Sequence, residues 1–140
     1  MRVLVIDDEP DILTLCRVNL EHAGHEVLEA ATAEEGLEIA LRDPPGLIVL
    51  DIMLPNRDGF SLLEELVVRP ETSEIPVVLL TARAQLEDKI KGWRAGAAGY
   101  VTKPFAPATL TETVGVVKQM TPEERTALRS RALGDLDPAS

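Results

Sequence analysis

Aromatic side chains are scarce in this chain, cysteine occurs once, and no long apolar run is present. With 3% aromatic residues, the core must be built from aliphatic side chains. The single cysteine, Cys16, excludes an internal disulfide and is expected to be a small buried residue rather than a nucleophile. A run of about 18 apolar residues would be needed for a transmembrane helix, and the sequence has none. We therefore expect a cytoplasmic protein.

Basic residues are also in the minority. The chain has 14 Lys and Arg against 24 Asp and Glu, for a net charge of -10. Nucleic acids and anionic membranes attract basic surfaces, so we expect no direct contact with nucleic acid or membrane. The length of 140 residues favours one main domain with a sizeable core.

Short apolar runs alternate with helical periodicity along most of the chain. The expected strands lie at roughly 2–6, 26–30, 46–50, 76–80 and 99–102, and the expected helices at roughly 9–23, 32–41, 58–68, 84–94 and from Pro107 onward. Five strand-helix repeats predict an α/β fold with a doubly wound, five-stranded parallel sheet and helices on both faces.

The character of the chain changes after Met120. Thr121 to Glu124 reads Thr-x-x-Glu with Pro122 at the first helical position, which is typical of a helix start. We expect a short charged helix to about Ala132 and then a polar end. The predicted organisation is a main domain over 1–120 and a helical or flexible tail over 121–140, either packed on the domain or mobile.

Polar side chains stand where four of the expected strands end. Asp7 and Asp8 follow the first strand, Asp51 the third, Thr81 the fourth and Lys103 the fifth. In such sheets ligands bind beyond the carboxyl ends of the strands. The sequence therefore predicts one site at this edge.

The residue types at this edge suit phosphoryl chemistry with a divalent cation. Three neighbouring carboxylates would repel one another and have raised pKa values, and Mg²⁺ would relieve the conflict. The alternative is that Asp8 only caps the first helix. Asp51 is the candidate nucleophile for an aspartyl phosphate, with Lys103 supplying positive charge and Thr81 a hydroxyl. The bond before Pro104 is a candidate for a cis peptide.

These motifs together resemble the receiver domain of two-component response regulators, over about residues 1–120. The resemblance rests on four motifs: Asp7-Asp8, Asp51-x-x-x-Pro55 with Asp58-Gly59, Thr81-Ala82, and Tyr100-x-x-Lys103-Pro104-Phe105. It implies a flavodoxin-like sheet of strand order 2-1-3-4-5.

The resemblance also implies a role for each site residue. Asp51 accepts a phosphoryl group from a histidine kinase or a histidine phosphotransfer protein. Asp8, Asp51 and the backbone carbonyl of Met53 hold Mg²⁺, and Asp7 contributes through water. Thr81 and Tyr100 form a switch. The resulting change is presented to a protein partner on the face made by the fourth helix, fifth strand and fifth helix. Such a protein promotes its own phosphorylation and dephosphorylation without being a conventional enzyme.

Two features bear on how this chain differs from typical receiver domains. Met53 and Arg83 lie two residues beyond Asp51 and Thr81, where the family resemblance implies control over hydrolysis of the phosphoryl group. Their bulk predicts a long-lived phosphorylated form. The stretch 96–99 has no charged residue, and the expected helix from Pro107 onward has only Glu112 and Lys118. The chain thus lacks the charges with which some receiver domains of transcription factors dimerise.

Three alternatives remain beside a stand-alone receiver. The chain could be the N-terminal part of a longer regulator with a DNA-binding or enzymatic output domain. It could be a hydrolase or nucleotide-binding enzyme on a similar sheet, although no glycine-rich phosphate loop follows the first strand. It could also be a receiver-like binding module that is never phosphorylated.

Overall fold

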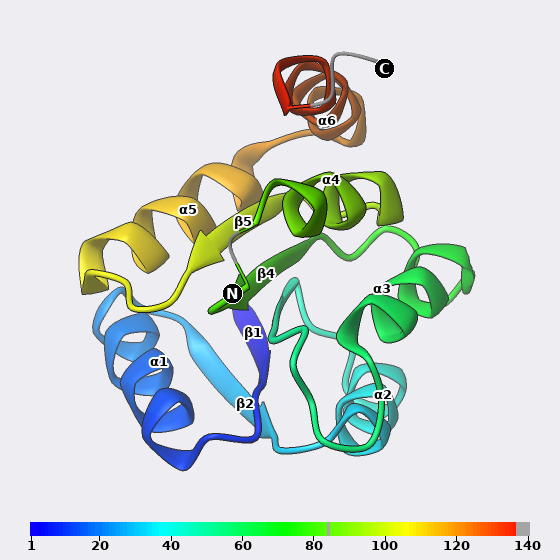
Figure 1. The fold of residues 1–140 in the computed structure, drawn as a ribbon. Coiled ribbons are helices and arrows are strands. Elements are labelled where there is room, and N and C mark those ends of the chain that lie inside the picture. The colour runs from blue at the N-terminus through cyan, green and yellow to red at the C-terminus, as the bar shows by residue number, and fades with distance from the viewer. Residues whose placement is uncertain (84, 137–140) are drawn as a thin grey trace.

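The computed structural model of the protein describes residues 1–83 and 85–136. Five parallel strands form one sheet in the order β2-β1-β3-β4-β5, with helices on both faces (Figure 1). The strands are β1 (Arg2–Ile6), β2 (Glu26–Ala30), β3 (Leu47–Leu50), β4 (Val77–Thr81) and β5 (Gly99–Thr102). The helices are α1 (Pro10–His22), α2 (Ala33–Arg42), α3 (Gly59–Val68), α4 (Leu86–Ala95), α5 (Pro107–Gln119) and α6 (Pro122–Leu136). The predicted fold class and strand order are confirmed.

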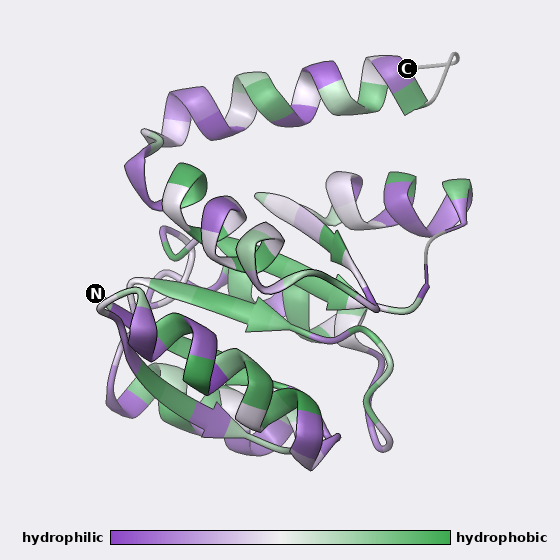
Figure 2. Cartoon of the chain, turned by 90° about the vertical axis from the view of Figure 1, so that its left-hand side faces the viewer, coloured by the Kyte–Doolittle hydropathy of each residue, from purple (hydrophilic) through white to green (hydrophobic). Residues whose placement is uncertain are grey.

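The central strands are buried on both faces, which explains their continuous apolar sequences. Every residue of β3 and β4 is buried, whereas the edge strand β2 is mostly half-exposed. Figure 2 shows the sheet as mainly hydrophobic and the outer helix α6 as alternating hydrophilic and hydrophobic residues. Two aliphatic layers result, one on each face of the sheet.

Each layer is closed by its own helices. One layer packs the buried side chains of α2 and α3, such as Phe60 and Leu63, against the sheet. The other includes Cys16 and Leu20 of α1 and Val114 of α5. Cys16 is fully buried as predicted, and burial raises the pKa of its thiol to about 12, so the thiol is not activated.

Local side-chain caps fix several of the helix starts. Thr32 Oγ1 accepts a hydrogen bond from the backbone N–H of Glu35 at 3.1 Å. In the second Thr-x-x-Glu motif, Thr121 Oγ1 accepts from Glu124 N–H at 3.1 Å, and Glu124 Oε1 accepts from Thr121 N–H at 3.0 Å. Both predicted capping sites therefore begin helices.

The last helix is longer than expected. It continues to Leu136, past the expected end near Ala132, and Leu133 and Leu136 are half-buried like Ala132. The side chains of these three residues are thus partly covered, and the helix continues through Gly134. The expected start of the fourth helix at residue 84 lies outside the described residues, as do residues 137–140 of the polar end expected after Gly134.

Within 1–83 and 85–136, we find no helix with the length and apolar content required to cross a bilayer.

Candidate functional site

The acidic residues at the strand ends converge because β1 and β3 are neighbours. Ile6 pairs with Leu50 in the parallel ladder, so Asp7 and Asp51 leave the sheet side by side. The Asp51 N–H donates to the carbonyl of Ile6 at 2.9 Å. Carboxylate oxygens of Asp7, Asp8 and Asp51 lie within 4.8 Å of one another, as the sequence predicts. Asp7 and Asp51 are buried, and Asp8 is exposed.

Lys103 brings a positive charge into this acidic cluster from the end of β5. Its ammonium nitrogen lies 2.7 Å from Asp7 Oδ2 and 3.0 Å from Asp51 Oδ2. It also lies 3.0 Å from Glu9 Oε1. The peptide bond between Lys103 and Pro104 is cis, which confirms that prediction. One cation thus bridges acids that are far apart in the sequence.

Burial and neighbouring charges shift the pKa values of the site residues in opposite directions. Burial raises the pKa of Asp7 to about 6, and the nearby Asp51 carboxylate also raises it. The hydrogen bonds from Lys103 and from the Glu9 N–H lower this pKa, but by less than burial raises it. Burial alone would lower the pKa of Lys103, yet its contacts with Asp7, Asp51 and Glu9 raise it. Lys103 therefore stays charged, while Asp7 carries an electrostatic cost that a second cation would reduce.

The oxygen-only donor set fits a hard divalent cation. Asp7 Oδ2 is buried, and within the described residues the Lys103 ammonium, at 2.7 Å, is its one polar partner. The backbone N–H of Met53 donates to Asp51 Oδ1 at 2.9 Å, which keeps the Met53 peptide beside that carboxylate. Carboxylates and a nearby backbone carbonyl are ligands that Mg²⁺ accepts. The residues present therefore suit the ion.

The loop from β3 to α3 is packed tightly against the start of α3. Gly59 N–H donates to the carbonyl of Ile52 at 2.8 Å. A β-carbon at Gly59 would lie 2.5 Å from Ile52 Cα and 2.6 Å from the Asp51 carbonyl oxygen. Asp58 caps α3 by accepting from the Phe60 N–H at 2.9 Å. The Asp58-Gly59 pair thus lets the chain fold back directly behind the candidate nucleophile.

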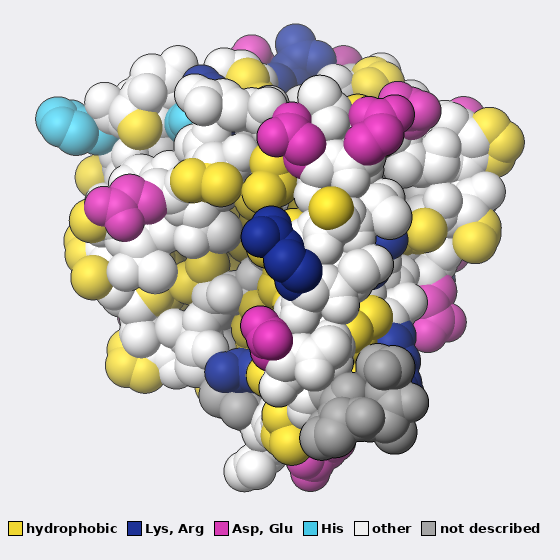
Figure 3. All heavy atoms as spheres, turned by 90° about the horizontal axis from the view of Figure 1, so that it is seen from above, with side chains coloured by type: hydrophobic (Ala, Val, Ile, Leu, Met, Phe, Trp, Pro, Cys, Tyr) yellow, Lys and Arg dark blue, Asp and Glu magenta, His cyan; other side chains and the backbone are white. Residues whose placement is uncertain are grey.

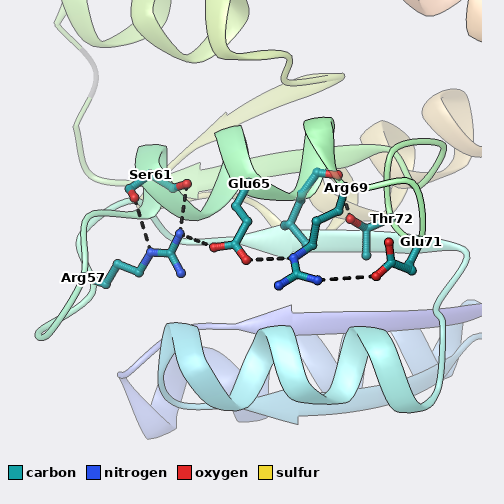
Figure 4. Close-up of polar contacts among 7 residues, drawn as sticks. Arg57, Ser61, Glu65, Arg69, Glu71 and Thr72 are labelled. Atoms are coloured by element: carbon teal, nitrogen blue, oxygen red, sulfur yellow. Dashed lines mark hydrogen bonds and ion pairs between the residues drawn. The ribbon is translucent and has the colours of Figure 1, made fainter.

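A row of charged side chains ties the same loop to the outer face of α3 (Figure 4). Arg57 donates to Ser61 Oγ at 3.3 Å and to Glu65 Oε1 at 2.6 Å. Arg69 donates to the other oxygen of Glu65 at 2.8 Å and to Glu71 at 3.4 Å. The hydrogen bonds from Arg69 and from Arg57 lower the pKa of Glu65. Arg57 therefore joins the loop to α3, and Glu65 links Arg57 to Arg69 at the other end of the helix.

Thr81 and Tyr100 meet at a shared residue in the loop after β4. Thr81 is buried, and its Oγ1 accepts from the Arg83 N–H at 3.2 Å. The Tyr100 hydroxyl donates to the carbonyl of Arg83. The half-buried Tyr100 ring lies beside Gly92, where a β-carbon would come within 3.2 Å of the ring. Burial raises the pKa of Tyr100 to about 12, so the hydroxyl is a donor at neutral pH.

Some contacts at the site were not predicted from the sequence. Glu9 was not among the predicted site residues, but it is the third carboxylate on Lys103. The guanidinium of Arg83 pairs with Asp88 at 2.6 Å and lies 5.5 Å from the centre of the Phe60 ring. No spacing pattern distinguishes these residues from ordinary surface charges. Pairs between loops leave no periodic signal.

A family model described as the response regulator receiver domain matches residues 3–115. The chain belongs to the response regulator receiver domain family. The receiver domain also has a solved structural neighbour, the chemotaxis protein CheY4 of Vibrio cholerae. That neighbour has a TM-score of 0.79 and 32% sequence identity, with 83% of this chain and 97% of the other covered.

Two curated relatives of this receiver domain differ in length. It is 46% identical over 104 residues to the DNA-binding dual master transcriptional regulator RpaA of Synechocystis, covering 74% of this chain and 43% of RpaA. It is 37% identical over 116 residues to the protein PilH of Pseudomonas aeruginosa, covering 83% of this chain and 96% of PilH. The chain spans about half the length of RpaA and nearly all of PilH.

Proposed function

We propose that Asp51 accepts a phosphoryl group from the phosphohistidine of a histidine kinase or phosphotransfer protein. The carboxylate forms an O–P bond as the N–P bond of the donor breaks, and the histidine leaves with the electron pair. The observation that carries this proposal is the buried Asp51 carboxylate with the Lys103 ammonium 3.0 Å from its Oδ2. A cytoplasmic location is part of the proposal, supported by the single cysteine.

The chain's own residues would prepare this transfer mainly by charge and position. Asp8, Asp51 and the Met53 carbonyl would hold Mg²⁺, with Asp7 acting through water, and the ion would neutralise charge developing on the phosphoryl oxygens. Lys103 stays protonated and can pair with a phosphoryl oxygen. The Met53 N–H fixes the direction of the Asp51 carboxylate.

The proposal extends to a switch at Thr81 and Tyr100. Both side chains bond to Arg83, so a Thr81 hydroxyl drawn toward a phosphoryl oxygen would change the setting of the Tyr100 ring. Tyr100 lies on β5 and packs beside α4, and it therefore connects the site to the α4–β5–α5 face. A protein partner on that face would read the change as a population shift.

The extent of the functional unit is also proposed. We assign the receiver domain to 1–120 and a tail to 121–140, with signalling to a separate protein. The match covers less than half of RpaA. This coverage favours a second candidate function, the N-terminal receiver of a longer regulator with a DNA-binding or enzymatic output domain. Coverage of nearly all of PilH favours the stand-alone form.

Magnesium removal tests the phosphoacceptor proposal. With a small-molecule phosphodonor and Mg²⁺, the protein is expected to gain the mass of one phosphoryl group, mapped by proteolysis to the peptide that contains Asp51. With excess chelator, the initial rate of uptake should fall at least about tenfold, because the acid cluster then lacks its neutralising cation. Intact-mass spectrometry measures both. Uptake that maps to another residue, or no uptake at all, would contradict the proposal.

A second prediction concerns the lifetime of the phosphorylated form. Met53 and Arg83 line the same groove, of about 520 Å³, beside the β3–α3 loop. Their side chains are expected to restrict the approach of water, giving a half-life of minutes or longer. Met53→Ala and Arg83→Ala should each shorten it severalfold in mass measurements after donor removal. Val68→Ala, at an exposed apolar residue of α3, is the control and should leave the half-life unchanged. A wild-type half-life of seconds would refute the prediction.

A further inference from the structure

Helix α6 lies against α4, at the top of the molecule in Figure 1. Its half-buried residues recur at helical spacing and form one stripe, which faces the body. The stripe consists of Arg125, Leu128, Arg129, Ala132, Leu133 and Leu136. No residue of α6 in the described range is fully buried. The helix is thus docked by one side through partial contacts.

Arginine side chains supply the polar part of this docking. Arg129 donates to the carbonyls of Gly96 and Ala97 at 3.3 and 3.5 Å. These carbonyls lie just after the C-terminal end of α4, where unpaired carbonyls and the helix dipole favour a positive charge. Arg125 donates to the carbonyl of Glu74 at 3.3 Å. All three contacts are long, and each contributes modestly.

The contact between α6 and the body leaves grooves on both sides of the helix. One, of about 410 Å³, is lined by Trp93 of α4, Val116 of α5 and Leu128 of α6, among others. A second, of about 210 Å³, is lined by Val67, Ile75 and residues of α6. Side chains that line an open groove make fewer dispersion contacts than side chains in a close-packed core. The docked helix therefore leaves apolar surface of α4 and α5 uncovered.

The charges of α6 are divided between its two sides. Arg125 and Arg129 face the body, whereas Glu123, Glu124, Arg131 and Asp135 are exposed. Figure 3 views the molecule from the α6 side and shows charged side chains of both signs interspersed with apolar ones. The reciprocal capping bonds at the start of α6 are local, so they favour helix whether or not the helix is docked.

We propose that the surface formed by the end of α4, the start of β5 and α5 is a helix-binding site, with α6 as its displaceable intramolecular occupant. The partner is a protein that presents an amphipathic helix with a leucine in the place of Leu128 and an arginine in the place of Arg129. The leucine enters the groove beside Trp93, and the arginine binds the carbonyls at the end of α4, the helix-in-groove mode of recognition. Only the use of this face in signalling depends on the proposed function. The binding of α6 to the face does not.

A peptide competition experiment tests the site. The probe is a fluorescently labelled synthetic peptide of residues 121–136, titrated into full-length protein by anisotropy. Leu128→Asp removes the internal helix from its place, so this variant is expected to bind the peptide at least about tenfold more tightly than wild type, since it lacks the internal competitor. Ser130→Asp, on the exposed side of α6, is the control and should bind as weakly as wild type.

Three readouts keep the result interpretable. Circular dichroism checks that the variants fold. A second variant, Arg129→Ala, is expected to gain affinity for the peptide, but less than Leu128→Asp does. The fluorescence of Trp93, the single tryptophan, should shift to longer wavelength in Leu128→Asp and return when the peptide binds. A peptide carrying Arg129→Glu should bind at least about tenfold more weakly, because a carboxylate would face the α4 carbonyls.

Several outcomes would overturn the inference. Equal affinity of wild type and Leu128→Asp for the peptide would show that α6 does not occupy the site. Binding without a Trp93 response would put the site elsewhere. A wild-type dimer by size-exclusion chromatography that Leu128→Asp abolishes would make a second copy the occupant instead. Phosphoryl uptake needs no α6 contact and is measured separately, so its failure would leave the helix site standing.

Discussion

The Asp51→Asn variant is expected to take up no phosphoryl group under conditions in which the wild-type protein is fully converted. Asparagine has the shape of aspartate, and its side-chain oxygen can still accept from the Met53 N–H. It lacks the anionic oxygen that must attack phosphorus. Lys103 keeps its contacts with Asp7 and Glu9, so the charge pattern around the position is largely retained.

A matched variant separates loss of the nucleophile from general damage to the loop. Asp58→Asn makes the same chemical change, and asparagine also serves as a helix cap at the start of α3. This control should take up a phosphoryl group as the wild type does. Intact-mass spectrometry compares all three proteins, and thermal unfolding confirms that each is folded. Uptake by Asp51→Asn at the wild-type level would place the acceptor elsewhere and remove the proposed mechanism.

The Gly59→Ala variant is expected to lose about 3 kcal/mol or more of unfolding free energy, at the upper end of the range for overpacking. Its new methyl group would lie 2.5 Å from Ile52 Cα and 2.6 Å from the Asp51 carbonyl oxygen. Both neighbours are backbone atoms, which cannot move aside by changing rotamer. The chain after β3 would have to shift, and the Asp51 carboxylate with it, so phosphoryl uptake should also slow.

Gly115→Ala supplies the comparison for this second variant. Gly115 lies within α5, and a β-carbon there would meet no atom within 4 Å. Alanine should therefore stabilise the protein by about 0.5 to 1 kcal/mol through helix propensity. Urea denaturation followed by circular dichroism measures both changes. If Gly59→Ala unfolded at the wild-type urea concentration, the close packing behind Asp51 would not be important for stability.

The alternation of strands and helices was predictable from the sequence because burial and periodicity leave a direct trace in it, whereas the strand order was implied by the resemblance to receiver domains. Strands β1, β3 and β4 are buried on both faces over nearly all of their length, and apart from Arg2 and Thr81 they consist of Val, Leu and Ile. Thr32 and Thr121 mark helix starts through side-chain bonds to residues three positions away. The meeting of Asp7 with Asp51 follows from the pairing of β1 with β3.

Contacts that depend on backbone carbonyls were not predictable in the same way. Arg129 binds the carbonyls of Gly96 and Ala97, and Tyr100 binds that of Arg83. A carbonyl is present at every residue, so its partner cannot be identified from residue type. For the same reason the sequence left open whether the tail packs on the domain, and the length of α6 was underestimated. Close approaches such as Gly59 to Ile52 also require coordinates.

The position of Lys103 has a consequence for synthesis on the ribosome. The acids of the site are made early, at residues 7, 8, 9 and 51, whereas the ammonium group that bridges them comes after β5. A nascent chain that has emerged only through β4 holds the carboxylates without that counter-charge. The pocket around Asp51 therefore acquires this positive charge only once Lys103 has been translated and β5 has added to the sheet edge.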